Sequence, residues 1–155
     1  MNEDLLDRVV DVYRRALQRW NARDAQGFAA QFAADGHLIA FDGSATNGRT
    51  EIASTIAAVF QNELTGIYVA TIREVREIVP GVVVLRSVVG MVPPDSANLN
   101  QVVHAVQSVV FVDRDGEVQI LLAQSTPASY HGRPEVAELL ALELEAARRS
   151  QRVKH

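Results

Sequence analysis

The feature that most constrains the fold is a pair of apolar runs around the tetrapeptide Asp-Arg-Asp-Gly at residues 113–116. An Asp-Gly pair between two strand-like runs is among the strongest local signals for a β-hairpin. Within residues 104–126, apolar side chains occupy both faces of this predicted ribbon, whereas a hairpin with one solvated face alternates apolar and polar residues. We therefore expect one face to be buried by the chain's own helices and the other by a second cover, such as another copy of the chain.

The composition narrows the class of protein. A length of 155 residues predicts one domain, and 48% hydrophobic with 22% charged residues is typical of a globular protein. A net charge of −4 argues against a nucleic-acid or anionic-membrane partner, and the absence of cysteine excludes disulfides and thiolate chemistry. The start is acidic and amphipathic, unlike a signal peptide, and no run of about 18 apolar residues could span a bilayer. We expect a cytoplasmic protein.

Hydrophobic periodicity predicts the other elements. The expected helices span residues 5–20, 24–34, 49–62 and 134–149, and the expected strands span residues 37–42, 67–79 and 82–92, besides the hairpin. Asp24 is expected to cap the second helix, which would place Phe28 and Phe32 on one helical face. Helices that come early and strands that come late predict an α+β fold, with helices covering one face of a curved antiparallel sheet.

Several motifs together resemble a known superfamily. They are Trp-Asn-Ala-Arg-Asp at 20–24, Phe28, Phe32, Gly-Arg at 48–49, Gly-Met-Val-Pro-Pro at 90–94, Gln-Ser-Thr-Pro at 124–127 and His-Gly-Arg-Pro-Glu at 131–135. As a set they resemble the nuclear transport factor 2-like superfamily, and more narrowly its SgcJ/EcaC branch, close to DUF4440 and SnoaL-like proteins. The chain departs from the branch at Val118, where tryptophan is common, and at Ser125, where asparagine is common.

The resemblance implies a cone-shaped domain over residues 1–155, in which helices wrap a bent sheet and leave an apolar pocket. It also implies a homodimer formed through the sheet. Residues 133–155 lie beyond most of the match, so we expect a C-terminal helical extension that caps the pocket or embraces the partner. Because some members of the branch belong to bacterial gene clusters for enediyne and other polyketide antibiotics, the implied ligand is a hydrophobic, polyketide-like molecule.

The expected pocket combines core aromatic residues with a few polar ones. The predicted ligand-binding residues are Trp20, Phe28, Phe32, Phe41, Phe60, Tyr68, Arg86, Gln107 and Gln124. Pairing across a two-residue turn places Gln107 opposite Gln124, where the two amides either bond to each other and nearby backbone or hold a ligand carbonyl or hydroxyl. Arg86 needs an anionic partner if it is buried, and its alternative role is a strand-edge salt bridge with Glu74 or Glu77.

Three residues are candidates for acid–base chemistry, namely His104, Tyr68 and Asp42. His104 is the best general base by residue type, but strand parity turns it away from Gln107, toward the face assigned to the dimer. Asp42 is either a pocket carboxylate or the cap of its own loop.

Cofactor and metal sites are not predicted. The four histidines lack metal-ligand spacing, and no glycine-rich dinucleotide fingerprint follows a strand. Ketosteroid-isomerase-like chemistry needs a carboxylate base inside an apolar pocket, and no Asp or Glu lies mid-strand in the hairpin. Three functions stay open: an enzyme or accessory cyclase-type protein acting on a polyketide-like intermediate, a non-catalytic binder or carrier, and a dimeric module whose pocket is vestigial.

Overall fold

The computed structural model describes residues 3–99 and 104–153. Its elements, in chain order, are α1 (Glu3–Asn21), α2 (Ala25–Ala29), β1 (Phe32–Ile39), β2 (Ala45–Asn47), α3 (Arg49–Asn62), β3 (Ile67–Val79), β4 (Val82–Val92), β5 (Ala105–Arg114), β6 (Glu117–Pro127) and α4 (Pro134–Val153). Among the described residues, none of the helices combines the length and the hydropathy that a membrane-spanning helix requires.

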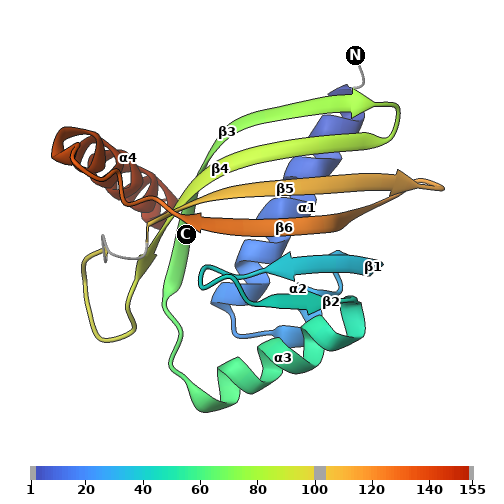
Figure 1. The fold of residues 1–155 in the computed structure, drawn as a ribbon, viewed down its shortest axis with the longest axis horizontal. Coiled ribbons are helices and arrows are strands. Elements are labelled where there is room, and N and C mark those ends of the chain that lie inside the picture. Colours follow the sequence, from blue (N-terminus) through green and yellow to red (C-terminus); the bar gives the residue numbers. More distant parts are fainter. Residues whose placement is uncertain (1–2, 100–103, 154–155) are drawn as a thin grey trace.

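The six strands form one curved sheet in the order β2-β1-β6-β5-β4-β3. Neighbouring strands are antiparallel except β1 and β6, which run parallel, so the sheet is mixed. Figure 1 shows α1 crossing behind the long strands, and α2 and α3 gathered beside the end of the sheet formed by β1 and β2. The α4 helix lies at the left of the view, beyond the end of β6. The predicted α+β cone with an extra C-terminal helix is confirmed.

The central hairpin forms as predicted. Asp115 and Gly116 both have positive φ, at 56° and 83°, which is the backbone of a type I′ turn and the reason that Asp-Gly is favoured there. Further along β6, Leu121 has no partner on β5, because Phe111 pairs with Ile120 and Val110 with Leu122. This β-bulge shifts the pairing of every residue beyond it by one position.

The bulge overturns one prediction. Gln107 lies opposite Ser125, and Gln124 lies opposite Ser108, so the expected pairing of the two glutamines is wrong. Counting from a two-residue turn assumes an unbroken ladder, and the unpaired Leu121 breaks it. Gln124 consequently points to the opposite face of the sheet from Gln107.

The second helix is shorter than predicted. Asp24 caps α2 as expected, its side chain accepting a 2.9 Å hydrogen bond from the Gly27 N–H, but α2 ends at Ala29. Phe32 instead begins β1 and pairs with Ile120 of β6, so sheet formation overrides the helical spacing. Phe28 and Phe32 still meet, with ring centroids 5.3 Å apart. A short strand that was not predicted, β2, also forms between β1 and α3.

Two apolar clusters lie on opposite faces of the sheet. The inner cluster fills the space between the sheet and α1, α2 and α3. Its buried members are Leu5, Val9, Val12, Tyr13, Ala16, Ala29, Phe32, Ile52, Ala53, Ile56, Phe60, Val83, Leu85, Val109, Phe111 and Ile120. The outer cluster is smaller and joins α4 to the other face, through Val88, Leu140 and Leu144 with Leu99, Val106, Ala128 and Tyr130 packed around them.

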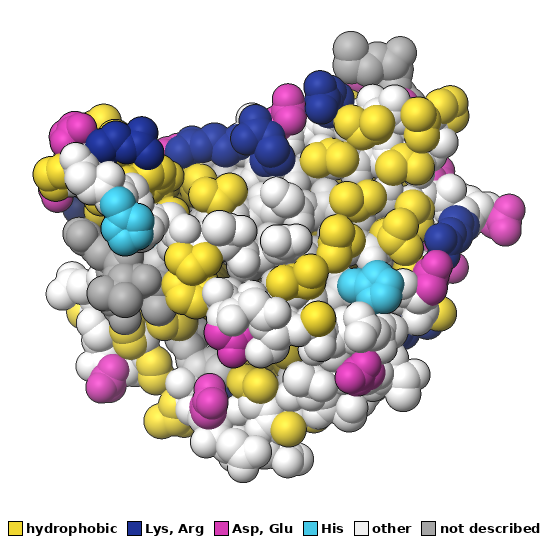
Figure 2. Space-filling view, in the orientation of Figure 1, with side chains coloured by type: hydrophobic (Ala, Val, Ile, Leu, Met, Phe, Trp, Pro, Cys, Tyr) yellow, Lys and Arg dark blue, Asp and Glu magenta, His cyan; other side chains and the backbone are white. Residues whose placement is uncertain are grey.

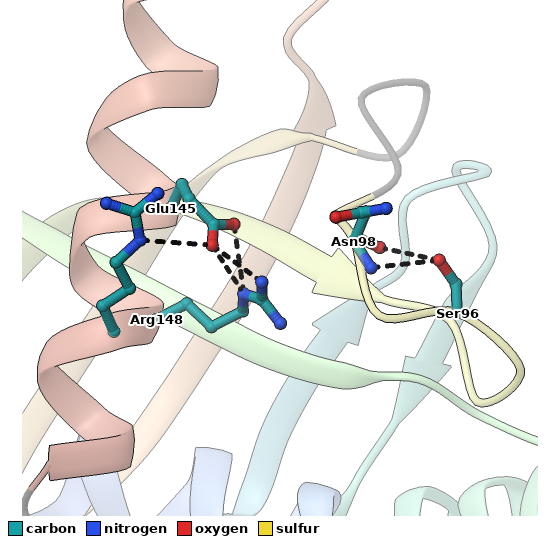
Figure 3. A network of polar contacts seen from close by, with 5 residues as sticks. Ser96, Asn98, Glu145 and Arg148 are labelled. Atoms are coloured by element: carbon teal, nitrogen blue, oxygen red, sulfur yellow. Dashed lines mark hydrogen bonds and ion pairs between the residues drawn. The ribbon is translucent and has the colours of Figure 1, made fainter.

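The α4 helix meets the sheet along a narrow stripe. Leu140 and Leu144, four residues apart, are buried, whereas Leu139 and Leu142 are 67% and 60% exposed. Leu139 and Leu142 therefore lie outside the contact between α4 and the sheet. Ion pairs add to the packing: Arg73 of β3 binds Glu143 of α4. Figure 3 shows Arg148 paired with Glu145 along the helix, near the loop where Ser96 bonds Asn98.

Candidate functional site

A cavity of about 130 Å³ lies between the inner sheet face and the first three helices. Its lining residues are Leu17, Trp20, Phe28, Leu38, Ala40, Phe41, Ile56, Tyr68, Val89, Ala105, Gln107 and Ser125. Most of these side chains are aliphatic or aromatic, and none carries a formal charge at neutral pH. The cavity is therefore an apolar chamber with a small polar area supplied mainly by β5 and β6.

Trp20, near the end of α1, is the centre of the aromatic wall. Its ring makes edge contacts with Phe28, Phe60 and Tyr68, at centroid distances of 5.5, 5.0 and 5.8 Å. Edge-to-face pairs of this kind favour a defined ring orientation beyond simple area burial. The Trp20 Nε1 atom is buried and has no hydrogen-bond partner among the described residues. The wall is thus aromatic, fixed by ring-to-ring packing, and retains one unpartnered N–H at Trp20.

A row of polar side chains reaches the floor of the cavity through Gln107 and Ser125. Ser87 of β4 pairs with Gln107 of β5, which pairs with Ser125 of β6, so the three side chains share one face of the sheet. Tyr13 reaches the row from α1, and its Oη lies 2.6 Å from both Ser87 Oγ and Gln107 Oε1. On its other side, Gln107 donates from Nε2 to Ser125 Oγ at 3.2 Å. We call Tyr13, Ser87, Gln107 and Ser125 together the polar row.

The ionisation of the tyrosines bears on what chemistry is available. Desolvation by burial raises the pKa of Tyr13 well above its usual value, outweighing the opposing hydrogen bond from Ser87. Burial also raises the pKa of Tyr68. Both phenols therefore stay protonated at neutral pH, and amides and hydroxyls do not titrate there. The arrangement can orient and polarise a ligand through hydrogen bonds, while a proton-transfer step would need a group from outside the lining residues.

The structure places the predicted ligand-binding residues in three locations. Trp20, Phe28, Phe41, Tyr68 and Gln107 line the cavity. Phe32 and Phe60 are buried in the inner cluster behind that lining.

The two remaining predicted ligand-binding residues, Arg86 and Gln124, lie outside the cavity on the exposed outer face. The Arg86 Nε is 3.2 Å from Glu74 Oε1, which is the strand-edge salt bridge considered as its alternative role.

Two of the three catalytic candidates also lie outside the cavity. His104 is 3% exposed on the outer side, where a Cβ atom on Gly90 would stand 3.3 Å from His104 Cδ2 and 3.0 Å from Leu144 Cδ1. Burial there lowers the pKa of His104. Asp42 is exposed and accepts a 2.9 Å hydrogen bond from the Ser44 N–H, which lowers the pKa of Asp42 and caps the loop. Tyr68 alone of the three lines the cavity.

Sequence reasoning missed three members of the polar row. Tyr13 has the helical spacing of a core residue, and that spacing gives no sign of its hydrogen bonds. Ser87 interrupts the run Val-Val-Val-Leu-Arg-Ser-Val-Val, and a buried serine in such a run needs a partner, which was an available signal. Ser125 could not be assigned without the bulge at Leu121. Among the described residues, no group of three His, Asp or Glu side chains is placed to hold a metal ion.

Comparison with known proteins identifies the fold. No family profile and no curated protein matches the sequence. Among solved structures, a domain of unknown function with a cystatin-like fold from Nostoc punctiforme is 22% identical, with a TM-score of 0.74 over 92% of this chain and 90% of that one. A nuclear transport factor 2-like protein of unknown function from Pseudomonas putida is 15% identical, with a TM-score of 0.68 over 84% and 92%. A ketosteroid isomerase-like protein from Erwinia carotovora atroseptica is 19% identical, with a TM-score of 0.65 over 83% and 99%. The chain therefore has the nuclear transport factor 2-like fold.

Proposed function

We propose that this chain binds a small hydrophobic molecule in the cone cavity. The observation that carries the proposal is an uncharged, largely apolar chamber in which Gln107 and Ser125 are held by hydrogen bonds within the polar row. A pocket with apolar walls and a few convergent polar groups is the usual form of a small-molecule site. The cavity volume is close to that of a ~150 Å³ apolar cavity known to accept benzene, so one ring of a ligand fits inside.

The ligand class that we propose is a polyketide-like molecule, with the chain acting as an accessory or cyclase- and isomerase-like protein of bacterial antibiotic biosynthesis, of enediyne type. The motif resemblance supports this class, and a ketosteroid isomerase-like protein among the structural neighbours is consistent with ring-shaped ligands. Because the lining residues include no carboxylate and no histidine, we favour binding and orientation of the molecule over acid–base catalysis. A non-catalytic carrier of the same molecule is the second candidate, and the lack of a carboxylate and a histidine among the lining residues favours it.

We also propose that the chain forms a homodimer through the outer face of the sheet. Val84, Val110 and Leu122 share that face in register and are only partly buried, since α4 covers a different part of it. Figure 2 shows apolar side chains gathered over the strands on this side. Sedimentation should give about twice 17.0 kDa, and Val110→Asp should give the monomer mass because it places a charge in the interface. A wild-type monomer at micromolar concentration would refute the dimer.

Intrinsic fluorescence tests the binding proposal directly, because Trp20 is the only tryptophan of the chain and lines the cavity. Titration with ethylbenzene, a one-ring hydrocarbon, should give a saturable change in the emission of Trp20. Ala40→Phe adds a ring at the lining and should weaken binding at least ten-fold. Ala34→Phe is the matched control, since Ala34 is an exposed alanine of β1, the strand that ends one residue before Ala40, and does not line the cavity. Absence of a saturable change, or equal weakening by both variants, would refute the proposal.

A further inference from the structure

The polar row has a defined hydrogen-bond direction. Each phenol carries one proton, and the Tyr13 proton is donated to Gln107 Oε1 at 2.6 Å. The Ser87 hydroxyl adjoins the same two oxygens, 2.6 Å from Tyr13 Oη and 3.5 Å from Gln107 Oε1. The carbonyl oxygen of Gln107 is thereby occupied from the α1 side, and its amide nitrogen is turned toward Ser125. Tyr13 and Ser87 act as positioning residues for this amide.

The row has two donor hydrogens left for a ligand, besides one lone pair of Ser125 Oγ. The Gln107 Nε2 group carries two hydrogens, and one of them is given to Ser125 Oγ. The Ser125 hydroxyl hydrogen is given to no other group in the described part of the chain. Both side chains line the cavity. The floor thus presents an N–H and an O–H next to each other, while its carbonyl is already engaged.

The charge of the site limits which acceptor fits. No Lys, Arg or His belongs to the lining, so a carboxylate or phosphate would be buried there without a counter-charge. A neutral acceptor loses much less on leaving water and gains hydrogen bonds that replace those with water. From these observations we infer that the cavity selects a neutral carbonyl compound, a ketone or quinone ring, and binds its oxygen at Gln107 and Ser125. This inference rests on the proposed binding function and names the substrate class.

A matched pair of one-ring probes tests the inference separately from the proposed function. Acetophenone and ethylbenzene differ at the carbon that bears the carbonyl oxygen, so the ratio of their Kd values isolates the contribution of the oxygen. We expect Ser125→Ala to raise the Kd of acetophenone about five-fold and to leave the Kd of ethylbenzene the same. A change of about five-fold is the usual contribution of one net hydrogen bond. Ser108→Ala is the control, because Ser108 is an exposed serine of β5 outside the cavity. Benzoate, the charged analogue, should bind at least ten-fold more weakly than acetophenone.

A spectroscopic readout does not depend on affinity. The isotope-edited infrared band of the acetophenone carbonyl should lie at lower frequency in the wild-type complex than in the Ser125→Ala complex, because donated hydrogen bonds weaken the C=O bond. Tyr13→Phe should move the ratio of Kd values as well, since Gln107 then loses the contact that orients it. If both probes bind and Ser125→Ala leaves ratio and band unchanged, the inference is wrong and the binding function stands. If neither probe binds, both are wrong.

Discussion

The polar row on the inner face of the sheet and His104 on the outer face are buried in opposite ways. On the inner face, Tyr13, Ser87, Gln107 and Ser125 are buried or half-buried, and each has a partner within the row. On the outer face, His104 is buried under α4 with its Nε2 atom unpartnered among the described residues. Burying a polar group costs little when its hydrogen bonds are replaced and roughly 1–3 kcal/mol when they are not. We therefore expect the inner side to be the stable part of the fold and the outer side to open first.

The largest contrast should come from matched leucine truncations, one in each cluster. Leu85 and Leu144 are both fully buried, in the inner and outer clusters respectively. Leu85→Ala should lower the free energy of unfolding by about 2–5 kcal/mol, as expected for a large cavity in a core. Leu144→Ala should cost only about 1–2 kcal/mol, because α4 can undock locally while the rest of the fold persists. Urea denaturation measures both, and equal losses would contradict the comparison.

Removing one hydroxyl from the polar row tests whether its members depend on one another. Tyr13→Phe keeps the ring but leaves Gln107 Oε1 short of its donor, so stability should fall by about 1–3 kcal/mol. Tyr130→Phe is the control at the outer cluster, where no described group bonds the hydroxyl, and it should be close to neutral. A neutral Tyr13→Phe variant would show that the row contributes nothing to the fold.

Acid should weaken the outer side through His104. Its pKa is lowered by burial, so below the unfolded-state value of about 6.5 the unfolded chain binds more protons than the folded one. Stability is therefore fully present above pH ~6.5 and is lost as the pH falls from there toward the folded-state pKa. His104→Leu should flatten this dependence between pH 7 and 5 in thermal melts. His37→Gln, at an exposed histidine bonded to Asn47, should leave the slope in place.

The smallest effect should come from the ion pair that joins β3 to α4. Arg73 and Glu143 are partly exposed, at 41% and 35%, and pairs of this kind contribute about 0.2–1 kcal/mol. Arg73→Ala should therefore lower stability only slightly, and the loss should shrink further in 0.5 M salt. Hydrogen exchange of the α4 amides is the sensitive measurement. Unchanged exchange would show that the leucine contacts alone hold the helix.

Features set by a few adjacent residues were predicted better than features set by contacts between distant segments of the chain. The Asp-Gly turn was predictable because only a few residues tolerate two consecutive positive φ angles, and strand parity placed Gln107 and His104 on opposite faces of the sheet. Gln124 was misplaced because the Leu121 bulge depends on how β6 fits against β1 and β5, which no single stretch encodes. Phe32 left the predicted helix for the same reason, since its strand pairing forms with a residue far along the chain. The polar row joins α1, β4, β5 and β6, so only the assembled fold reveals it.

The unpaired residue at position 121 also gives the strand a tolerance for changes in length. Deleting a residue from a regular central strand reverses the orientation of everything that follows, which exchanges its buried and exposed side chains. Here, deleting Leu121 would remove the one residue that β5 does not pair, so Ser125 would still lie opposite Gln107. Leu121 is in this sense an extra residue of β6. Because β5 does not pair with it, its presence leaves the orientation of Ser125 toward the cavity unchanged. A variant of this chain that lacks Leu121 should therefore present the same β5 and β6 side chains to a ligand.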